Sequence, residues 1–216
     1  MAADDRGGTR IFVASRNAKK IAEMERILAP LIPGVHVVGL DDVEFYDEPI
    51  EDAATFEGNA LIKARAGFRA TGLPSVADDS GLCVDALNGM PGVLSARWSG
   101  QPRGSKEGAD ARNNQLLLDQ LADVPDERRG AYFTCAIAFV HGEGPEGEIV
   151  VRGRMDGHVI REQRGSGGFG YDVLFVADDT PDGRTSAELS VSEKDEISHR
   201  GRAMREIGPR IAEVLR

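Results

Sequence analysis

The order of helix-forming and strand-forming segments constrains the fold of this chain most. Apolar runs predict strands at residues 10–14, 35–38, 75–78, 131–140, 148–154 and 173–176. Apolar residues spaced for one helix face predict helices from the turn at 15–17 to about residue 28, over 56–70, over 109–121 and over 198–216, the last one kinked or split at Gly208-Pro209. Helices alternate with strands early, whereas 131–140 and 148–154 are expected to pair as an antiparallel hairpin with a longer loop. The pattern therefore predicts an α/β fold with a mixed sheet flanked by helices.

The size and charge of the chain limit its partners. Its 216 residues suffice for one large domain or two small lobes, and no internal repeat or dividing linker is found. No apolar run approaches membrane-spanning length, and the acidic residues 1–8 lack the apolar stretch of a signal peptide, so we expect a disordered lead-in to a cytoplasmic protein. The net charge of −10 disfavours nucleic-acid binding but permits a small phosphorylated ligand in a locally basic pocket. Cys83 and Cys135 are isolated in apolar surroundings, which indicates buried free thiols.

Residues 76–81, Val-Ala-Asp-Asp-Ser-Gly, place two adjacent carboxylates at the end of a short apolar run. The strand is expected to end there and to turn sharply at Gly81. Two neighbouring anions repel each other and favour a cation, which fits a Mg²⁺ site. An Asp-rich turn without a ligand is the alternative, because Asp, Ser and Gly all favour turns.

Residues 15–20, Ser-Arg-Asn-Ala-Lys-Lys, lie where a strand leads into a helix. Backbone N–H groups at a helix N-terminus, with small polar side chains, favour an anion such as phosphate, and Lys20 adds a positive charge. The segment lacks the glycine pattern of a P-loop. Simple helix capping with a solvated lysine pair remains the alternative.

Residues 165–170 spell Gly-x-Gly-x-x-Gly, but the following apolar residues predict a strand, whereas a dinucleotide-binding loop must open a helix. What remains is a loop that carries Phe169, Tyr171 and Asp172. An aromatic ring beside a carboxylate suits a nucleobase, and a glycine-rich turn with core aromatics is the alternative.

Glu193, Lys194 and 197–200 are expected just before and at the start of the last helix. Arg and His donors at a helix N-terminus suit an anion or a base carbonyl oxygen. His199 alone is more often structural, and the other histidines show no ligand spacing, which argues against zinc.

Together these segments resemble the inosine triphosphate pyrophosphatase family over nearly the whole chain. The matching motifs are Ser15-x-Asn17-x-x-Lys20, Thr55-Phe-x-x-Asn59-Ala-x-x-Lys63-Ala, Ala77-Asp-Asp-Ser-Gly-Leu, Pro91-Gly-x-x-Ser-Ala-Arg97-Trp-x-Gly100, Gly167-Gly-Phe-Gly-Tyr-Asp172, and Ala187-Glu-Leu with Glu193-Lys194 and Ser198-His-Arg200. Each motif is weak alone, but six in register are specific.

The resemblance implies an elongated α/β fold over 9–216, with two lobes around a mixed sheet, a central nucleotide-binding cleft, a homodimer and dependence on Mg²⁺. It implies hydrolysis of non-standard purine nucleoside triphosphates (ITP, dITP and XTP) to the monophosphate and pyrophosphate, by attack of a Mg²⁺-activated water on the α-phosphorus. A pyrophosphatase of modified pyrimidine nucleotides and a nucleotide-binding module without turnover remain the alternatives.

The resemblance also implies roles for single residues. Asp79 is expected to act on water and to bind Mg²⁺ with Glu51, although Glu48 and Asp52 are alternatives to Glu51. The expected substrate-binding residues are Ser15, Arg16, Asn17, Ala18, Lys19, Lys20, Lys63, Ser80, Arg97, Phe169, Gly170, Tyr171, Asp172, Lys194, His199 and Arg200. Among them Lys20, Lys63 and Lys194 are expected to offset charge on the pyrophosphate, and Arg200 or a backbone N–H is expected to pair with the 6-oxo group of the base.

The two aspartates are expected to differ if the strand continues through both. Successive strand residues point to opposite sides, so both cannot bind the same cation. Asp79 is then assigned to metal and water, and Asp78 to a lysine or a backbone donor.

Overall fold

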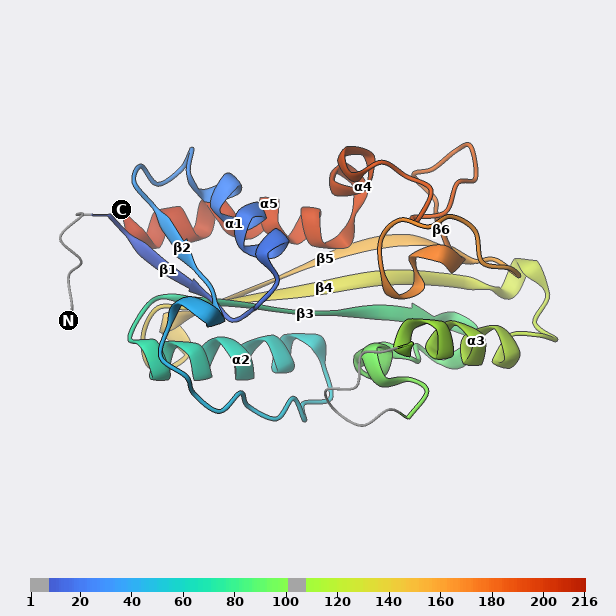
Figure 1. Ribbon diagram of the computed structural model, residues 1–216, viewed down its shortest axis with the longest axis horizontal. Coiled ribbons are helices and arrows are strands. Elements are labelled where there is room, and N and C mark those ends of the chain that lie inside the picture. The colour runs from blue at the N-terminus through green and yellow to red at the C-terminus, as the bar shows by residue number, and fades with distance from the viewer. Residues whose placement is uncertain (1–7, 101–107) are drawn as a thin grey trace. The chain divides into compact units, whose positions relative to one another are not determined.

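The computed structural model describes residues 8–100 and 108–216, which form a mixed α/β fold (Figure 1). Its sheet has six strands in the order β2-β1-β3-β4-β5-β6. They are β1 (Arg10–Val13), β2 (His36–Val38), β3 (Ser75–Val84), β4 (Gly130–Val140), β5 (Glu148–Val159) and β6 (Phe175–Ala177). β1 pairs in parallel with β2 and β3, whereas β5 pairs antiparallel with β6. The predicted mixed sheet is therefore confirmed.

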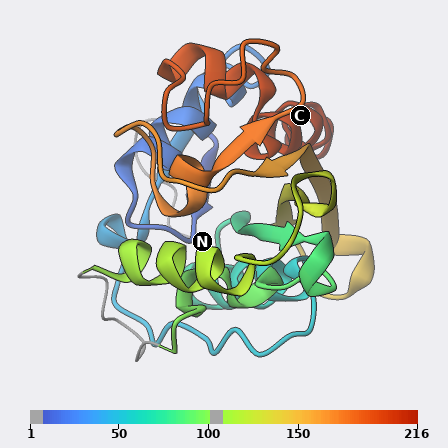
Figure 2. The same ribbon diagram turned by 90° about the vertical axis from the view of Figure 1, so that its right-hand side faces the viewer.

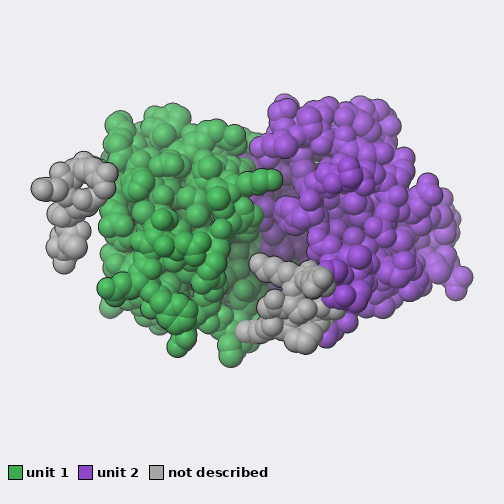
Figure 3. Space-filling model, in the orientation of Figure 1, with its two compact units in different colours: residues 1–79, 136–152, 202–216 green, residues 80–135, 153–201 purple. Residues whose placement is uncertain are grey.

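The chain divides into two compact units (Figure 3). Unit 1 comprises residues 1–79, 136–152 and 202–216, and unit 2 comprises 80–135 and 153–201. The boundaries fall inside β3, β4, β5 and α5 (His199–Leu215), so each of these elements contributes residues to both units. The predicted lead-in 1–8 lies outside the described residues except for Gly8.

In unit 1, helices cover both faces of β1 (Figure 1). α2 (Phe56–Thr71) lies on one face, where a Cβ at Gly67 would meet the ring of Phe12 at 2.6 Å. α1 (Ala18–Leu28) and α5 (His199–Leu215) lie on the other face, and a Cβ at Gly208 would meet Ile27 at 3.0 Å. Because both faces are covered, Phe12 and its strand neighbours are buried.

Local sequence explains the ends of α2. The Thr55 side chain accepts a hydrogen bond from the backbone N–H of Gly58 at 3.1 Å, which caps the N-terminus. Gly72 ends the helix with φ +67°, a conformation that glycine adopts without strain.

In unit 2, α3 (Ala109–Gln120) packs on the sheet through a core of apolar side chains (Figure 2). Its largest members are Leu82, Leu117, Leu121, Phe133, Met155, Tyr171, Leu174 and Phe175. The buried guanidinium of Arg129 donates to the carbonyl groups of Leu121, Val159 and Ile160 at 2.7, 2.8 and 3.1 Å. Burial lowers the pKa of Arg129, and its hydrogen bonds join the end of α3 to the end of β5.

The predicted turn at Gly81 is wrong, because β3 continues to Val84. Leu82, Cys83 and Val84 are buried apolar residues, and they extend the strand into unit 2. The polar Asp-Asp-Ser segment therefore interrupts the apolar pattern without ending the strand. β5 likewise runs beyond the expected residue 154 to Val159.

Two further expectations need correction near the C-terminus. The expected strand 173–176 begins only at Phe175, because Gly170–Leu174 forms the 3₁₀ helix η6. The last helix is not split at Pro209, since α5 runs as one helix from His199 to Leu215. Ile207 and Ile211, which flank the proline in the sequence, are both fully buried, so packing stabilises the helix around a residue that lacks a backbone N–H.

A short helix, α4 (Val191–Ile197), precedes α5 and was not expected. Ser190 and Glu193 form a capping box at its start, so Glu193 and Lys194 lie on α4 rather than just before the last helix. Cys83 and Cys135 are buried free thiols, as predicted. Within the part of the chain that the structure describes, no helix has the length and apolar character needed to cross a membrane.

Candidate active site

The strand-to-helix turn at residues 15–20 has the geometry of an anion site in unit 1. Asn17 stands outside the helix with extended backbone angles, and its side chain accepts the N–H of Lys19 at 3.0 Å. The Ser15 hydroxyl accepts the N–H of Asn17 at 3.1 Å. Ala18 and Lys19 lie in the first turn of α1, where backbone N–H groups favour an anion. The turn is therefore both a helix cap and a candidate phosphate site.

Arg16 in the same turn binds the acidic loop that contains residues 41–52. Its guanidinium pairs with Glu48, and its Nε lies 3.4 Å from Asp41. The hydrogen bond with Glu48 raises the pKa of Arg16. The side chain of this predicted substrate-binding residue thus connects the acidic loop to the strand-to-helix turn at residues 15–20.

Asp78 and Asp79 face opposite sides of β3, as the strand alternation predicted. The ammonium of Lys20 lies 2.9 Å from both carboxylate oxygens of Asp78. The other carboxylate, that of Asp79, accepts a hydrogen bond from the Asn59 amide at 3.0 Å. Asp78 therefore fixes a lysine, and Asp79 is directed toward α2.

Lys63 brings Glu51 and Asp79 to one place. Its ammonium lies 3.1 Å from the Glu51 carboxylate and 3.8 Å from that of Asp79. Burial raises the pKa of Asp79, and Glu51 and Asp78 add to the rise. Lys63 and the hydrogen bond from Asn59 act in the opposite direction. Burial is therefore the main reason that the charged form of Asp79 is disfavoured.

This donor set fits a hard divalent cation with few protein ligands. Within residues 8–100 and 108–216, no group of three or more acidic, His or Cys side chains lies close enough to hold a metal ion. Mg²⁺ is usually bound by one or two carboxylates, with waters and substrate phosphates as its other ligands. Glu51 and Asp79 provide that number of carboxylates.

In unit 2, the predicted substrate-binding residues Ser80 and Arg200 contact each other. An Arg200 guanidinium nitrogen donates to the Ser80 hydroxyl at 3.2 Å. The preceding His199 is buried, and its ring stacks on Phe133 with centroids 5.0 Å apart. His199 therefore has a packing role at the start of α5.

The glycine-rich loop presents an aromatic ring beside a cation. The side chain of Phe169 is 63% exposed, and the Lys194 ammonium lies 5.2 Å from its ring centroid. Asp172, only 3% exposed, accepts the Phe169 N–H at 2.8 Å and binds Lys194 at 2.5 Å. A Cβ at Gly168 would lie 2.2 Å from the Asp172 carboxylate, so the loop requires glycine there. One buried carboxylate thus holds both the loop and Lys194.

Two further predicted substrate-binding residues, Tyr171 and Arg97, are not exposed at the glycine-rich loop. Tyr171 is part of the buried core, and its hydroxyl donates to the Ser95 carbonyl at 2.9 Å. Burial also raises the pKa of the Tyr171 hydroxyl. Because Tyr171 is buried, its ring is not an exposed stacking surface. Arg97 ends the 3₁₀ helix η3 (Gly92–Arg97) and is half-buried.

The comparisons with known proteins agree with these motifs. A family model described as the Ham1 family matches residues 11–209. The chain belongs to the Ham1 family.

Similar Ham1 proteins include curated relatives named dITP/XTP pyrophosphatase. The protein of that name from Nocardia farcinica is 60% identical over 206 residues, which cover 94% of this chain and 95% of the relative. The one from Mycobacterium tuberculosis strain H37Rv is 57% identical, over 91% of this chain and 92% of the relative. The family assigned from the sequence motifs is confirmed.

Solved Ham1 structures have the same fold. A crystal structure described as a nucleoside-triphosphatase, dITP/XTP pyrophosphatase, from Mycobacterium abscessus matches with TM-score 0.75 and 56% identity, covering 92% of this chain and 98% of that one. A HAM1 protein from Coxiella burnetii matches with TM-score 0.84 and 38% identity, covering 95% and 99%.

Sequence reasoning missed several residues that organise this Ham1 site. On α3, Asp110 accepts the N–H of Gly170 at 2.7 Å, and the Asn114 amide donates to the Gly170 carbonyl at 2.9 Å. The two side chains are four residues apart and so share one face of the helix, which is a weak signal by itself. Asn59 was part of a motif but had no role assigned. Its buried side chain accepts the N–H of Ala53 at 3.0 Å and also binds Asp79.

Proposed function

We propose that this Ham1 protein hydrolyses the non-standard purine nucleoside triphosphates dITP, XTP and ITP to nucleoside monophosphate and pyrophosphate. The observation that carries the proposal is that the two neighbouring aspartates of β3 have different partners. Asp78 binds the lysine of a helix N-terminal turn, while Asp79 stands with Glu51 and Lys63. The name dITP/XTP pyrophosphatase of the relatives supports this choice of substrate.

In unit 1, the turn at residues 15–20 binds the triphosphate. N–H groups at the start of α1 and the hydroxyl of Ser15 donate to phosphate oxygens, and Lys20 offers a positive charge. Asp78 holds the Lys20 ammonium with both oxygens, so the cation is oriented before substrate binds. The turn is therefore locally basic, although the net charge of the chain is −10.

Glu51 and Asp79 would hold Mg²⁺. A bound Mg²⁺ would neutralise phosphate charge and make a nearby water more acidic. Glu51 is preferred over Glu48 because Lys63 binds Glu51 beside Asp79, while Glu48 is bound to Arg16. A bound divalent cation would replace Lys63 as the partner of Glu51 and Asp79, and Lys63 would then offer its charge to a substrate phosphate.

Asp79 accepts the proton of the water that attacks the α-phosphorus. The bond between the α-phosphorus and the bridging oxygen breaks, and pyrophosphate leaves with the electron pair. Lys20 and Lys63 offset the negative charge that develops on this leaving group. Asn59 keeps the Asp79 carboxylate in place through its hydrogen bond.

Unit 2 recognises the nucleoside. The exposed Phe169 ring offers a stacking surface, and Lys194 and Arg200 offer donors. We assign Lys194 to the nucleoside rather than to the pyrophosphate, because its ammonium lies 5.2 Å from the Phe169 ring. Hypoxanthine and xanthine carry a 6-oxo group that accepts such a donor, whereas adenine carries a 6-amino group that cannot. A site that relies on hydrogen bonds rejects the wrong base strongly.

The decisive experiment measures products and substrate preference together. Pyrophosphate and monophosphate are quantified from dITP, XTP and ITP, and from ATP and GTP as matched standard nucleotides, with and without Mg²⁺. We expect both products from the first three, little turnover of ATP and no turnover with EDTA. Equal turnover of ATP, or orthophosphate as the sole product, would contradict the proposal. Methylated pyrimidine triphosphates test the alternative substrate class, and binding without turnover would indicate a sensor.

The resemblance to the inosine triphosphate pyrophosphatase family further supports a homodimer. Light scattering after size-exclusion chromatography is expected to give twice the mass of the chain at micromolar concentration. A mass equal to that of one chain would contradict this part of the proposal.

A further inference from the structure

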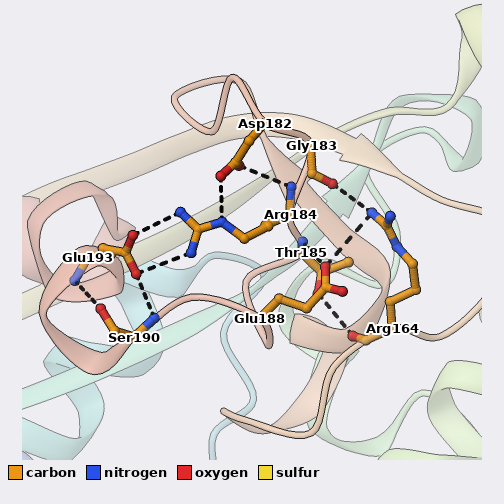
Figure 4. A network of polar contacts seen from close by, with 8 residues as sticks. All are labelled: Arg164, Asp182, Gly183, Arg184, Thr185, Glu188, Ser190 and Glu193. Carbon is orange, nitrogen blue, oxygen red and sulfur yellow. Dashed lines mark hydrogen bonds and ion pairs between the residues drawn. The ribbon is translucent and has the colours of Figure 1, made fainter.

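A polar network joins the segment 182–188 to helix α4 in unit 2 (Figure 4). The Arg184 guanidinium donates to both carboxylate oxygens of Glu193, at 2.8 and 3.3 Å. Its Nε donates to Asp182 at 2.6 Å. Such two-point contacts between a guanidinium and a carboxylate fix orientation as well as distance. Arg184 therefore clamps the first turn of α4 from outside the helix.

The Glu193 carboxylate takes part both in the contact with Arg184 and in the cap of α4. Its carboxylate accepts the N–H of Ser190 at 2.8 Å, and the Ser190 hydroxyl accepts the N–H of Glu193 at 3.3 Å (Figure 4). These reciprocal bonds form the capping box of α4. The hydrogen bond from Arg184 is the largest of the effects that lower the pKa of Glu193 to about 2. Because α4 has only seven residues, it depends on such contacts for its position.

Lys194 follows Glu193 directly in the helix. The contact between Arg184 and Glu193 therefore helps to position the Lys194 ammonium. That ammonium binds the buried Asp172 at 2.5 Å and lies 5.2 Å from the ring of Phe169. The long, flexible side chain of a lysine loses much rotamer freedom when it is held at one point. A helix turn held in register lowers the cost of placing the ammonium there.

The same segment also holds the glycine-rich loop. Arg164, just before that loop, donates to the carbonyl of Gly183 at 2.7 Å, and its own carbonyl accepts the Thr185 hydroxyl at 2.9 Å (Figure 4). Within the loop, the N–H of Gly167 donates to the Ala187 carbonyl at 3.0 Å. Segment 182–188 is thus a common support for the loop that carries Phe169 and the helix that carries Lys194.

We propose that Arg184 is a positioning residue that aligns Lys194 with Phe169 for binding of the nucleoside triphosphate. The inference rests on the proposed function, in which Lys194 contacts the nucleotide. Arg184 itself touches neither substrate nor metal and acts through Glu193.

The test compares the steady-state kinetics of dITP hydrolysis by the wild type and Arg184→Gln. We expect KM to rise about 3- to 10-fold while kcat stays within about twofold, because binding rather than the chemical step is weakened. Arg184→Lys keeps the charge but not the two-point contact, so its KM is expected to lie between those of the wild type and Arg184→Gln. Arg210→Gln is the matched control, since it removes an exposed Arg–Glu pair of 2.7 Å in unit 1, and its KM is expected to equal that of the wild type.

A second set of variants, made in the Lys194→Met protein, separates a positioning role of Arg184 from a general effect on stability. In Lys194→Met, whose own KM is raised, adding Arg184→Gln is expected to change KM by less than about twofold, because no ammonium remains to be placed. The Glu193 carboxyl resonance, which we expect to titrate near pH 2 in the wild type, should move toward its ordinary value in Arg184→Gln.

The outcomes separate the inference from its premise. If the wild type does not hydrolyse dITP, the proposed function fails and the inference fails with it. If Lys194→Met leaves KM unchanged, the contact of Lys194 with substrate is wrong. If Lys194→Met raises KM but Arg184→Gln and Arg184→Lys do not, or if Arg184→Gln acts equally in both backgrounds, the positioning role alone is overturned. Thermal unfolding of each variant shows whether it is folded, and Arg184→Lys provides the test if Arg184→Gln is not.

Discussion

Asp78 and Asp79 show how two identical neighbours acquire different roles at the scale of single residues. The alternation of β3 directs one to Lys20 and the other to Asn59 and Lys63. Removing the charge of either residue therefore has a different consequence.

Asp79→Asn is expected to lower kcat by a factor on the order of 10² to 10⁴, because the group that accepts the proton of water is lost. Asp78→Asn is the matched control on the same strand. It frees Lys20, so we expect KM to rise about 3- to 10-fold and kcat to fall by less than about tenfold. Steady-state kinetics on dITP measure kcat and KM of both variants. Equal losses in the two variants would refute the different roles of Asp78 and Asp79.

Asp79→Asn is also expected to unfold at a higher temperature than the wild type at pH 7 in EDTA. The folded-state pKa of Asp79 is raised, chiefly by burial, so the ionised group destabilises the fold. Stability is therefore lost as the pH rises from the unfolded pKa through the folded pKa, and it is regained at low pH. The neutral amide avoids this loss at pH 7.

The measurement is thermal unfolding by circular dichroism between pH 3 and pH 8. We expect the advantage of Asp79→Asn to shrink as the pH falls and the carboxyl group takes up its proton. Asp78→Asn, which breaks the ion pair with Lys20, is expected to unfold below the wild type at pH 7. A lower unfolding temperature for Asp79→Asn at pH 7 would show that its carboxylate is stabilising.

At the scale of elements, packing overrides intrinsic helix propensity in α2. Gly67 lies inside this helix, where alanine would normally stabilise by about 1 kcal/mol. A Cβ at this position would meet the fully buried ring of Phe12 at 2.6 and 2.8 Å. The close approach of α2 to β1 therefore requires glycine.

Gly67→Ala is expected to lower the free energy of unfolding by about 1–2 kcal/mol, because overpacking costs about 1–3 kcal/mol and exceeds the gain in propensity. Urea unfolding measures the change. The control is the same substitution in a Phe12→Leu background, where the smaller side chain leaves room and the loss should shrink. Stabilisation by Gly67→Ala in the wild-type background would show that the helix shifts without cost.

The elements also differ in how well the sequence predicted them. α1, α2 and α3 carry caps or long apolar periodicity, so their positions were predicted to within a few residues. α4 was missed because seven residues with few apolar positions give no periodic signal, although Ser190-x-x-Glu193 is a local capping-box pattern. β3 was predicted too short because the polar residues Asp78, Asp79 and Ser80 interrupt its apolar pattern.

At the scale of the whole molecule, three strands belong to both compact units. β3, β4 and β5 each cross a unit boundary, so the backbone of each strand is continuous between the units. Strands of one sheet are stabilised by their neighbours through hydrogen bonds and side-chain pairs. Local loss of structure in one unit therefore weakens strands that the other unit needs.

We expect one cooperative unfolding transition for the chain. Trp98, the only tryptophan of the sequence, reports on unit 2 by fluorescence, and far-ultraviolet circular dichroism reports on all helices and strands. The two probes should give coincident urea curves. Two separated transitions would show that the units unfold independently.

Arg129→Met in unit 2 tests the same coupling. It leaves the buried carbonyl groups of Leu121 and Val159 and the partly buried one of Ile160 without their side-chain donor, so we expect the free energy of unfolding to fall by about 2–4 kcal/mol. Both probes should shift by the same amount. A shift in tryptophan fluorescence alone would confine the effect to unit 2.

The sequence by itself determined the family, the mixed α/β fold class and most residues of the candidate site. These follow from features that are local along the chain, such as apolar periodicity, capping residues and short motifs in order. Only the tertiary structure decided what each side chain contacts. It directs Arg16 to the acidic loop, places Tyr171 in the core and uses Arg184 to hold α4. The reason is that ion pairs and packing join residues far apart in sequence, and their partners are set by distances and burial that no local pattern encodes.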